Sequence, residues 1–337
     1  MSPLKIRWEN GVVIEYDETR IIFDPQSKRL KCNASFITHA HVDHSHAFKI
    51  EHIPKFSSEE TMRLAAIDGA KASNWQPLPL NERIILDNIE VTPHPSGHVL
   101  GSYEFEIATP DGTILFTGDI NTRESRIIKP AEPVKCDVLV IESTFGSPDF
   151  VFPPDDAVAK SMVEWADRIL RDGRIPVFQA DSLGNAQEVI RIFNENTDLP
   201  VVSHCKVTKI NRVYEDYGYK MEYVDIGSRD AADLISNRNA VIVAPKHSNL
   251  SHKLELEEVE CVPALVSGWA LRFRRNSFPL SDHADFPSLI RFIGDCSPKL
   301  VLTYHGGRFN SVLAKYIEKK LKIGAYPIDL ITTNFRR

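Results

Sequence analysis

The chain has few cysteines and no long apolar run. Its five cysteines are scattered and include no Cys-x-x-Cys pair, which argues against a disulfide framework and against a cysteine-built zinc knuckle. No run of eighteen apolar residues is present, so the sequence predicts no membrane span and no membrane partner. The N-terminus also lacks the apolar core of a secretory signal. Together these absences predict a cytoplasmic protein.

A strong positive charge is also missing. The formal net charge of the 337 residues is −6, so no overall basic field would attract a polyanion. A nucleic-acid partner would have to be held by local basic patches and by bound metal ions. The composition, 42% hydrophobic and 26% charged, is that of a soluble globular chain long enough for two hydrophobic cores.

The pattern of apolar residues predicts an α/β protein. The first 150 residues read as strands with short turns, including a hairpin over 12–23, a buried strand over 34–38 and a helix beginning at the capping box Ser57-x-x-Glu60. Beyond residue 150, helices and strands alternate with the period of βαβ units. This change of pattern predicts two structural parts.

The most informative motif is His39-Ala40-His41-Val42-Asp43-His44, directly after the predicted strand 34–38. It places four metal-competent side chains within six residues, and three imidazoles with a carboxylate suit zinc. These ligands are more than one ion needs, so His39 and His41 could face one ion while Asp43 and His44 face a neighbour. The alternative is a polar loop that is rich in histidine by chance.

Further ligands are predicted at other strand ends. His98 and Asp119 each adjoin a glycine, where the backbone can turn sharply, and His305 ends the apolar run 300–304. His98 would complete a set with His39 and His41, and His305 would close the second site. One carboxylate can bridge two cations about 3.5–4 Å apart, a role that suits Asp119. Taken singly, each of these residues could instead be structural.

Three more residues are candidates for supporting roles. Asp24 ends the predicted strand 21–23, where it could orient a ligand or a bound water, or serve as an ordinary turn residue. Glu142 follows an apolar strand, and His283 lies in Ser281-Asp282-His283-Ala284-Asp285. If Glu142 contacts His283, the imidazole stays protonated and can give a proton to a leaving oxygen.

The order of these motifs resembles that of the metallo-β-lactamase superfamily. The stretches 141–146, 281–285 and 303–306 look like the three added motifs of its β-CASP nucleases, a family of RNA-processing and DNA cross-link repair enzymes. Within that family, the stretches 136–146, 267–269 and 281–286 are most similar to bacterial ligase-associated DNA exonucleases. The cross-link repair branch usually lacks a histidine at the position of His305.

The resemblance implies a fold, a metal centre and a division of the chain. It implies an αββα metallo-β-lactamase sandwich formed by residues 1–150 and 263–337, with an inserted α/β β-CASP domain at 151–262. It also implies two zinc ions and an acid pair, carried by these residues: His39, His41 and His98 on one zinc, Asp43, His44 and His305 on the other, Asp119 between them, and Glu142 with His283 as the pair.

Substrate contacts are predicted from two segments. Ser182 and Gly184 precede a predicted helix whose N-terminal amides could hold a backbone phosphate, and the segment resembles the Gly-x-Ala-Gln stretch of the β-CASP insertion. A plain capped loop is the alternative. Arg272, Arg274 and Arg275 could form a phosphate track, although a solvated charged face is the usual fate of such a run.

These interpretations predict a zinc-dependent nuclease. The expected activity is that of a DNA exonuclease in repair, acting on single strands or strand ends, with a DNA ligase or helicase as a possible partner. The alternative is an RNA exo- or endonuclease of the same family. A small-molecule hydrolase and an inactive scaffold subunit are the remaining rivals. The predicted acid pair argues against the first, and the full ligand set argues against the second.

Overall fold

The computed structural model describes residues 4–27, 31–246, 248, 250, 259–273, 276–331 and 333–335. The chain forms two compact units. The first unit comprises Met1–Glu124, Ile128–Val151 and His283–Arg337, and the second comprises Ser125–Ile127 and Phe152–Asp282.

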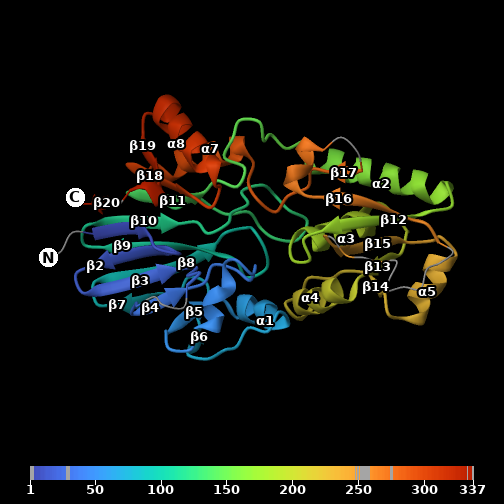
Figure 1. Cartoon of the computed structure of the whole chain (residues 1–337), viewed down its shortest axis with the longest axis horizontal. Coiled ribbons are helices and arrows are strands. Elements are labelled where there is room, and N and C mark those ends of the chain that lie inside the picture. Colours follow the sequence, from blue (N-terminus) through green and yellow to red (C-terminus); the bar gives the residue numbers. More distant parts are fainter. Residues whose placement is uncertain are drawn as a thin grey trace. The chain divides into compact units, whose positions relative to one another are not determined.

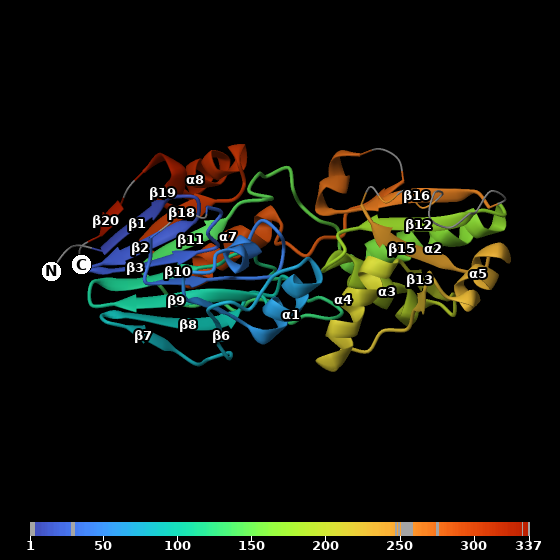
Figure 2. The same cartoon turned by 60° about the horizontal axis from the view of Figure 1, so that its bottom comes forward.

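The first unit contains two seven-stranded sheets (Figure 1). One sheet has the order β20 (Thr333–Phe335), β1 (Leu4–Trp8), β2 (Val12–Tyr16), β3 (Thr19–Phe23), β4 (Ala34–Phe36), β5 (Lys55–Ser57) and β6 (Trp75–Pro77). The other has the order β19 (Gly324–Pro327), β18 (Leu300–Tyr304), β11 (Val138–Glu142), β10 (Gly112–Phe116), β9 (Tyr103–Thr109), β8 (Ile89–Pro95) and β7 (Ile84–Leu86). Pairing of β1 with β20 brings the first and the last strand of the chain side by side (Figure 2).

Alternation along the strands builds the core between these sheets. Phe23 on β3 stacks with Phe36 on β4 at 5.2 Å between ring centroids, and meets Phe116 of the other sheet at 4.9 Å. On β10, Ile114 and Phe116 enter this core, whereas Leu115 between them points to the opposite face of the sheet. The two sheets are therefore bound by a shared apolar layer.

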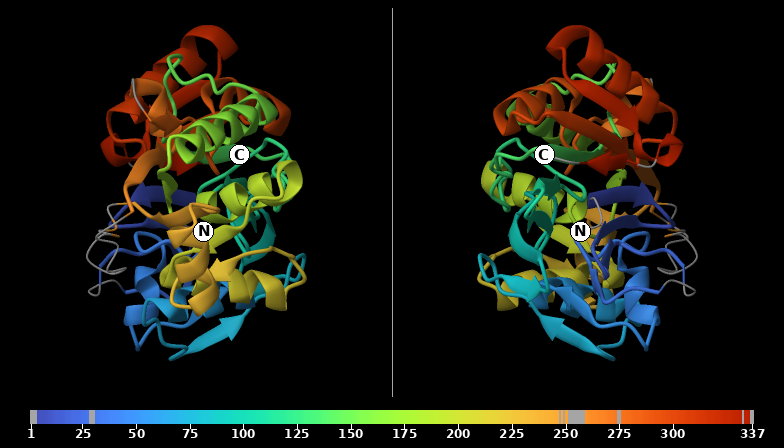
Figure 3. Two further views of the ribbon diagram at one scale, coloured as in Figure 1. Left: turned by 90° about the vertical axis from the view of Figure 1, so that its right-hand side faces the viewer. Right: turned by 90° about the vertical axis from the view of Figure 1, so that its left-hand side faces the viewer.

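Helices cover the outer face of the second sheet. Leu115 shares a cluster with residues of α7 (Phe286–Cys296) and α8 (Arg308–Leu321), which are seen in red on the outside of the unit in the right-hand view of Figure 3. The remaining helical segments of this unit are η1 (Ser45–Lys49), α1 (Glu59–Ile67) and η3 (Ile328–Leu330). The predicted αββα sandwich is confirmed.

The start of α1 differs from the prediction by one residue. Ser58, not Ser57, is the N-cap, because its hydroxyl accepts a hydrogen bond from Thr61 N. Ser57 ends β5, and its hydroxyl accepts a hydrogen bond from the indole of Trp75 on the neighbouring strand. Ser57, which the capping-box pattern assigned to the start of the helix, therefore belongs to a strand.

The second unit is a parallel α/β sheet (Figure 2). Its strands have the order β14 (Val224–Asp225), β13 (Val201–Ser203), β15 (Val241–Pro245), β12 (Ile175–Ala180), β16 (Cys261–Val266) and β17 (Ser277–Phe278). Its helices are α2 (Asp155–Arg171), α3 (Asn185–Asn196), α4 (Cys205–Asp216), α5 (Arg229–Ser236) and η2 (Gly268–Arg272). All five pairs of neighbouring strands run parallel, as βαβ units require.

This sheet moves one predicted domain boundary. The boundary expected at 262 falls inside β16, which pairs with β12, and β17 adds a further strand beyond β16. The second unit therefore extends to Asp282. Among the described residues, no helix is both long and apolar enough to cross a membrane.

Candidate metal centre

Asp24 organises the start of the histidine motif from a neighbouring strand. It follows β3, and its carboxylate accepts hydrogen bonds from Thr38 N at 2.8 Å, Thr38 Oγ1 at 2.7 Å and His44 Nδ1 at 2.7 Å. Because the single Thr38 hydroxyl proton goes to Asp24, Thr38 Oγ1 accepts from His39 Nδ1, 2.9 Å away. Asp24 thus fixes one imidazole directly and the other through Thr38, and it leaves the Nε2 lone pairs of His39 and His44 available for a ligand.

The first ligand group joins three histidines and one carboxylate. One candidate ligand atom from each of His39, His41, His98 and Asp119 lies within 4.8 Å of all the others. His98 Nε2 lies 3.0 Å from His41 Nδ1, and Asp119 Oδ2 lies 3.6 Å from His39 Nε2 and 3.8 Å from His98 Nε2. Three imidazole nitrogens and one carboxylate oxygen form the donor set of a tetrahedral zinc site.

The second ligand group adjoins the first through Asp119. Asp43, His44 and His305 meet the same 4.8 Å criterion. His305 Nε2 lies 3.4 Å from His44 Nε2 and 3.5 Å from Asp43 Oδ2, while Asp119 Oδ2 lies 3.4 Å from His44 Nε2. The Asp119 carboxylate therefore contacts members of both groups, and the seven predicted ligands converge.

Unpartnered buried atoms show that this cluster suits a divalent cation. His39 Nε2 and Asp119 Oδ1 are buried, and within the described chain neither has a hydrogen-bond partner, a costly state for polar atoms. Burial, with the nearby His44 and His98, holds the pKa of His39 well below its usual value. Burial opposes ionisation of Asp119, but His44 and His305 outweigh it and hold its pKa well below the usual range. A neutral imidazole and an ionised carboxylate are the forms that bind metal.

Close packing against neighbouring atoms, together with positive φ, explains the glycines beside two ligands. Gly97 and Gly118 both have positive φ, +72° and +56°. A Cβ on Gly97 would lie 2.2 Å from Asn121 O, and one on Gly118 would lie 2.7 Å from Thr38 Cγ2. His305 itself has φ of 59°, a conformation that costs energy for a residue with a Cβ and that is typical of functional sites.

The expected contact between Glu142 and His283 is present. His283 Nδ1 donates to Glu142 Oε1 at 2.9 Å, and the fully buried Glu142 also accepts from Ile120 N at 2.8 Å and Thr144 N at 3.3 Å. The His283 ring centroid lies 4.5 Å from that of His98. The imidazole therefore lies beside the first ligand group and is anchored to Glu142 through Nδ1.

The predicted substrate residues belong to the second unit. Gly184 is the N-cap of α3, and its amide donates to Gln187 Oε1 at 2.8 Å, so that amide is not free for a phosphate. Ser182 is half-buried, and its carbonyl accepts from Gln187 Nε2 at 3.0 Å. Arg272 is exposed, with its guanidinium 5.9 Å from the ring centroid of Trp269. Two further predicted residues lie outside the described residues: Arg274 and Arg275.

One contributor was missed by the sequence reasoning. Thr38 directly precedes His39, and its hydroxyl joins Asp24 to that imidazole. A threonine at the end of an apolar strand is also an ordinary strand residue, so its only signal was its place next to the motif.

The chain is similar to several known proteins. A family model for the Zn-dependent metallo-hydrolase RNA specificity domain matches residues 269–327. A protein named "Probable DNA ligase" from Opitutus terrae is 32% identical over 284 residues, which cover 81% of this chain and 26% of that protein. An "RNase J-like protein" from Methanocaldococcus jannaschii is 23% identical, with 94% of each chain covered.

Two further matches concern a eukaryotic relative and a solved fold. "Endoribonuclease ysh1" from Aspergillus fumigatus is 34% identical over 53% of this chain and 24% of its own length. The crystal structure of a protein of unknown function from Enterococcus faecalis V583 superposes with a TM-score of 0.65 at 14% identity, covering 98% of this chain and 100% of the other. These matches, with the αββα fold and the order of its ligand motifs, show that the chain belongs to the β-CASP nuclease family of the metallo-β-lactamase superfamily.

Proposed function

We propose that the chain is a two-zinc nuclease. The observation that carries this proposal is the convergence of seven ligands, two with buried unpartnered atoms, beside a Glu–His pair. The proposed ligands are His39, His41 and His98 for one zinc, and Asp43, His44 and His305 for the other, with Asp119 shared. Five imidazoles suit zinc better than magnesium, which prefers oxygen ligands.

The chain's own residues then perform defined tasks. When bound, the ions would supply an activated water and neutralise charge on the phosphodiester. Asp24 holds His44 in the tautomer that presents Nε2, and Thr38 does the same for His39. His283, anchored to Glu142 through Nδ1, keeps Nε2 as its second N–H and gives a proton to the leaving oxygen. Asp43 is 57% exposed, which leaves the cluster open to substrate.

DNA ends or single strands are the substrate that we favour. Support comes from the relative named as a DNA ligase, which is similar over 81% of this chain, and from the motif resemblance to ligase-associated exonucleases. The matched segment is 26% of that relative's length. We propose that this chain likewise acts together with a DNA ligase. Arg272, exposed over Trp269, offers a cation and an aromatic ring for a strand.

RNA is the second candidate substrate, on separate grounds. The matched family model is described as an RNA specificity domain. The relative from Methanocaldococcus jannaschii, which aligns with this chain over 94% of each protein, is named RNase J-like. RNA recognition would depend on contacts to the 2′-hydroxyl.

Cleavage of matched substrates tests the proposal. Zinc-loaded protein would be incubated with end-labelled DNA and RNA of the same sequence, single-stranded and duplex. We expect DNA to be shortened faster than RNA, with single strands preferred. Faster loss of RNA would favour the second candidate, and cleavage of neither polymer by metal-loaded protein would reject a nuclease.

A further inference from the structure

A second charged cavity lies wholly within the second unit. It has a volume of about 350 Å³ and is walled by the segment Ser125–Ile127, by α3 and by the loop that follows α4. Three of its lining residues are cations, Arg126, Arg191 and Lys220. The cavity shares no residue with the candidate metal centre.

The two arginines of this cavity keep unused hydrogen-bond capacity. Arg126 Nη2 donates to Asp156 at 2.6 Å, and Arg191 donates to Glu195 at 2.6 Å and to the carbonyl of Lys220 at 3.2 Å. Arg126 Nε lies 3.2 Å from Glu195 Oε2 without an aligned hydrogen bond. Since a guanidinium has five N–H donors, both side chains could still donate to an anion.

Buried contacts hold the cavity in shape. The Arg126 side chain is only 15% exposed, and its segment is fixed to α3 because Glu188 accepts hydrogen bonds from the Ser125 hydroxyl and from Arg126 N. Asp156, by contrast, is 95% exposed, so its ion pair with Arg126 is weak and readily exchanged for a stronger anion. The position of Arg126 is thus fixed by buried contacts, whereas its exposed partner Asp156 can be replaced by a bound anion.

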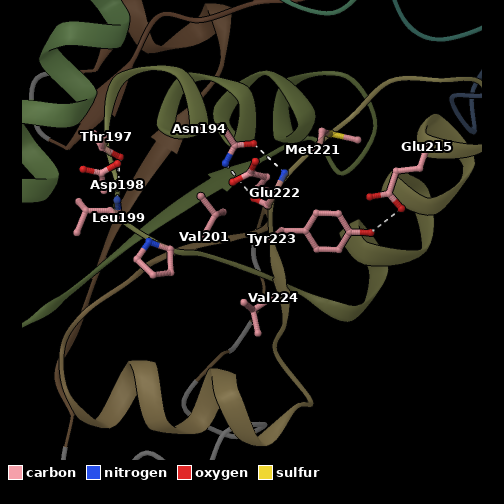
Figure 4. A pocket seen from close by; sticks show the side chains of 11 residues that line it. Asn194, Thr197, Asp198, Leu199, Val201, Glu215, Met221, Glu222, Tyr223 and Val224 are labelled. Atoms are coloured by element: carbon pink, nitrogen blue, oxygen red, sulfur yellow. Dashed lines mark hydrogen bonds between the residues drawn. The ribbon is translucent and has the colours of Figure 1, made fainter.

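An acidic pocket bounds the basic cavity. The two cavities share Met221, and the neighbouring pocket, of about 720 Å³, is lined by Asp198, Glu215 and Glu222. Figure 4 shows Glu222 beside Asn194, and Tyr223 directed toward Glu215, to which its hydroxyl donates at 3.2 Å. A continuous polyanion running from the basic cavity into this pocket would meet three carboxylates, so the basic cavity suits a single terminal phosphate better than a strand passing through.

We propose that this cavity is a phosphomonoester site, in which Arg126, Arg191 and Lys220 hold the phosphate and Tyr219 lines the space beside it. A phosphomonoester carries about two negative charges near neutral pH and matches such a cluster of donors. The same chemistry occurs in a free mononucleotide and at the phosphorylated end of a nucleic-acid strand. The inference concerns binding alone and holds whether or not the metal centre cleaves nucleic acid.

Hydrogen exchange on the zinc-loaded full chain would locate this binding. The probes are deoxyadenosine 5′-monophosphate, its unphosphorylated nucleoside, and one cleavage-resistant phosphorothioate oligonucleotide with and without a 5′-phosphate. We expect the phosphorylated probes alone to protect amides over 217–222. Protection of these amides by both the mononucleotide and the 5′-phosphorylated oligonucleotide would identify a site open to free nucleotides. Protection by the 5′-phosphorylated oligonucleotide alone would identify a site for strand ends.

Variants separate this site from the metal centre, which can also bind phosphate. Lys220→Ala, in an exposed loop, should raise the Kd for the phosphorylated probe that protects this loop by about fivefold and reduce its protection of 217–222 at a fixed probe concentration. Lys209→Ala on the exposed face of α4 is the matched control and should change neither. Hydrolysis of bis(p-nitrophenyl) phosphate should be equal in all three proteins. Equal protection by phosphorylated and unphosphorylated probes, or an unchanged Kd in Lys220→Ala, would overturn the proposal.

Discussion

Glu142 Oε1 lies 2.9 Å from His283 Nδ1, although the two residues are 141 positions apart in the chain. This contact orients the imidazole from a side chain that is itself fixed by two backbone amides. Replacement of either residue should therefore remove proton donation without removing the metal ligands.

The first prediction concerns this pair. His283→Ala should lower the rate of DNA cleavage by about 10²–10⁴-fold, the usual contribution of general acid catalysis, at unchanged zinc content. Bis(p-nitrophenyl) phosphate should be cleaved with a much smaller loss, because p-nitrophenolate leaves without protonation. Rates on both substrates and metal analysis would be compared. Equal losses on the two substrates would show that His283 is not the proton donor.

The shared carboxylate gives the second prediction. Asp119→Ala should lose bound zinc and cleavage together, because Asp119 contacts members of both ligand groups. The fold should remain, since the core of the sandwich is formed by apolar residues of the two sheets. Zinc stoichiometry, nuclease rate and circular dichroism would be measured on the same preparation. Full cleavage by this variant would rule out the two-metal arrangement.

Much of this architecture could be predicted because each ligand motif adjoins a short apolar strand. Strands β10, β11 and β18 are read directly from their apolar runs, and their ends carry Asp119, Glu142 and His305. Features that depend on distant partners could not be read in this way. The pairing of β16 with β12 set the domain boundary at Asp282, and the hydrogen bond from Trp75 fixed the role of Ser57.

The third prediction tests the support of His39. Thr38→Val removes the hydroxyl that joins Asp24 to the imidazole while keeping the side-chain volume. Zinc affinity should fall by about tenfold, as is typical when a residue that orients a metal ligand is lost. Thr38→Ser keeps the hydroxyl and is the matched control. Competition with a chelating dye would measure both affinities, and equal weakening in the two variants would indicate a packing effect instead.

The fourth prediction concerns a buried carboxyl group outside the metal centre. Glu104 on β9 is fully buried, and in the described part of the chain neither of its carboxyl oxygens has a hydrogen-bond partner. Burial, with a smaller contribution from Glu106, raises the pKa of Glu104 well above its usual value. The folded protein therefore keeps a proton that the unfolded chain releases above about pH 4.5. By linkage, the free energy of unfolding falls as the pH rises through this window.

Glu104→Gln removes this titration and leaves a neutral side chain of similar shape. The variant should match the wild type in stability near pH 5 and exceed it by about 1–3 kcal/mol at pH 8, where the wild type must either ionise a buried group or retain its proton at a cost. Urea unfolding at both pH values measures the difference. Glu82→Gln is the control, because Glu82 is exposed and does not contribute to the raised pKa of Glu104. A gain from Glu104→Gln that did not grow between pH 5 and pH 8 would show that Glu104 is not held in its protonated form.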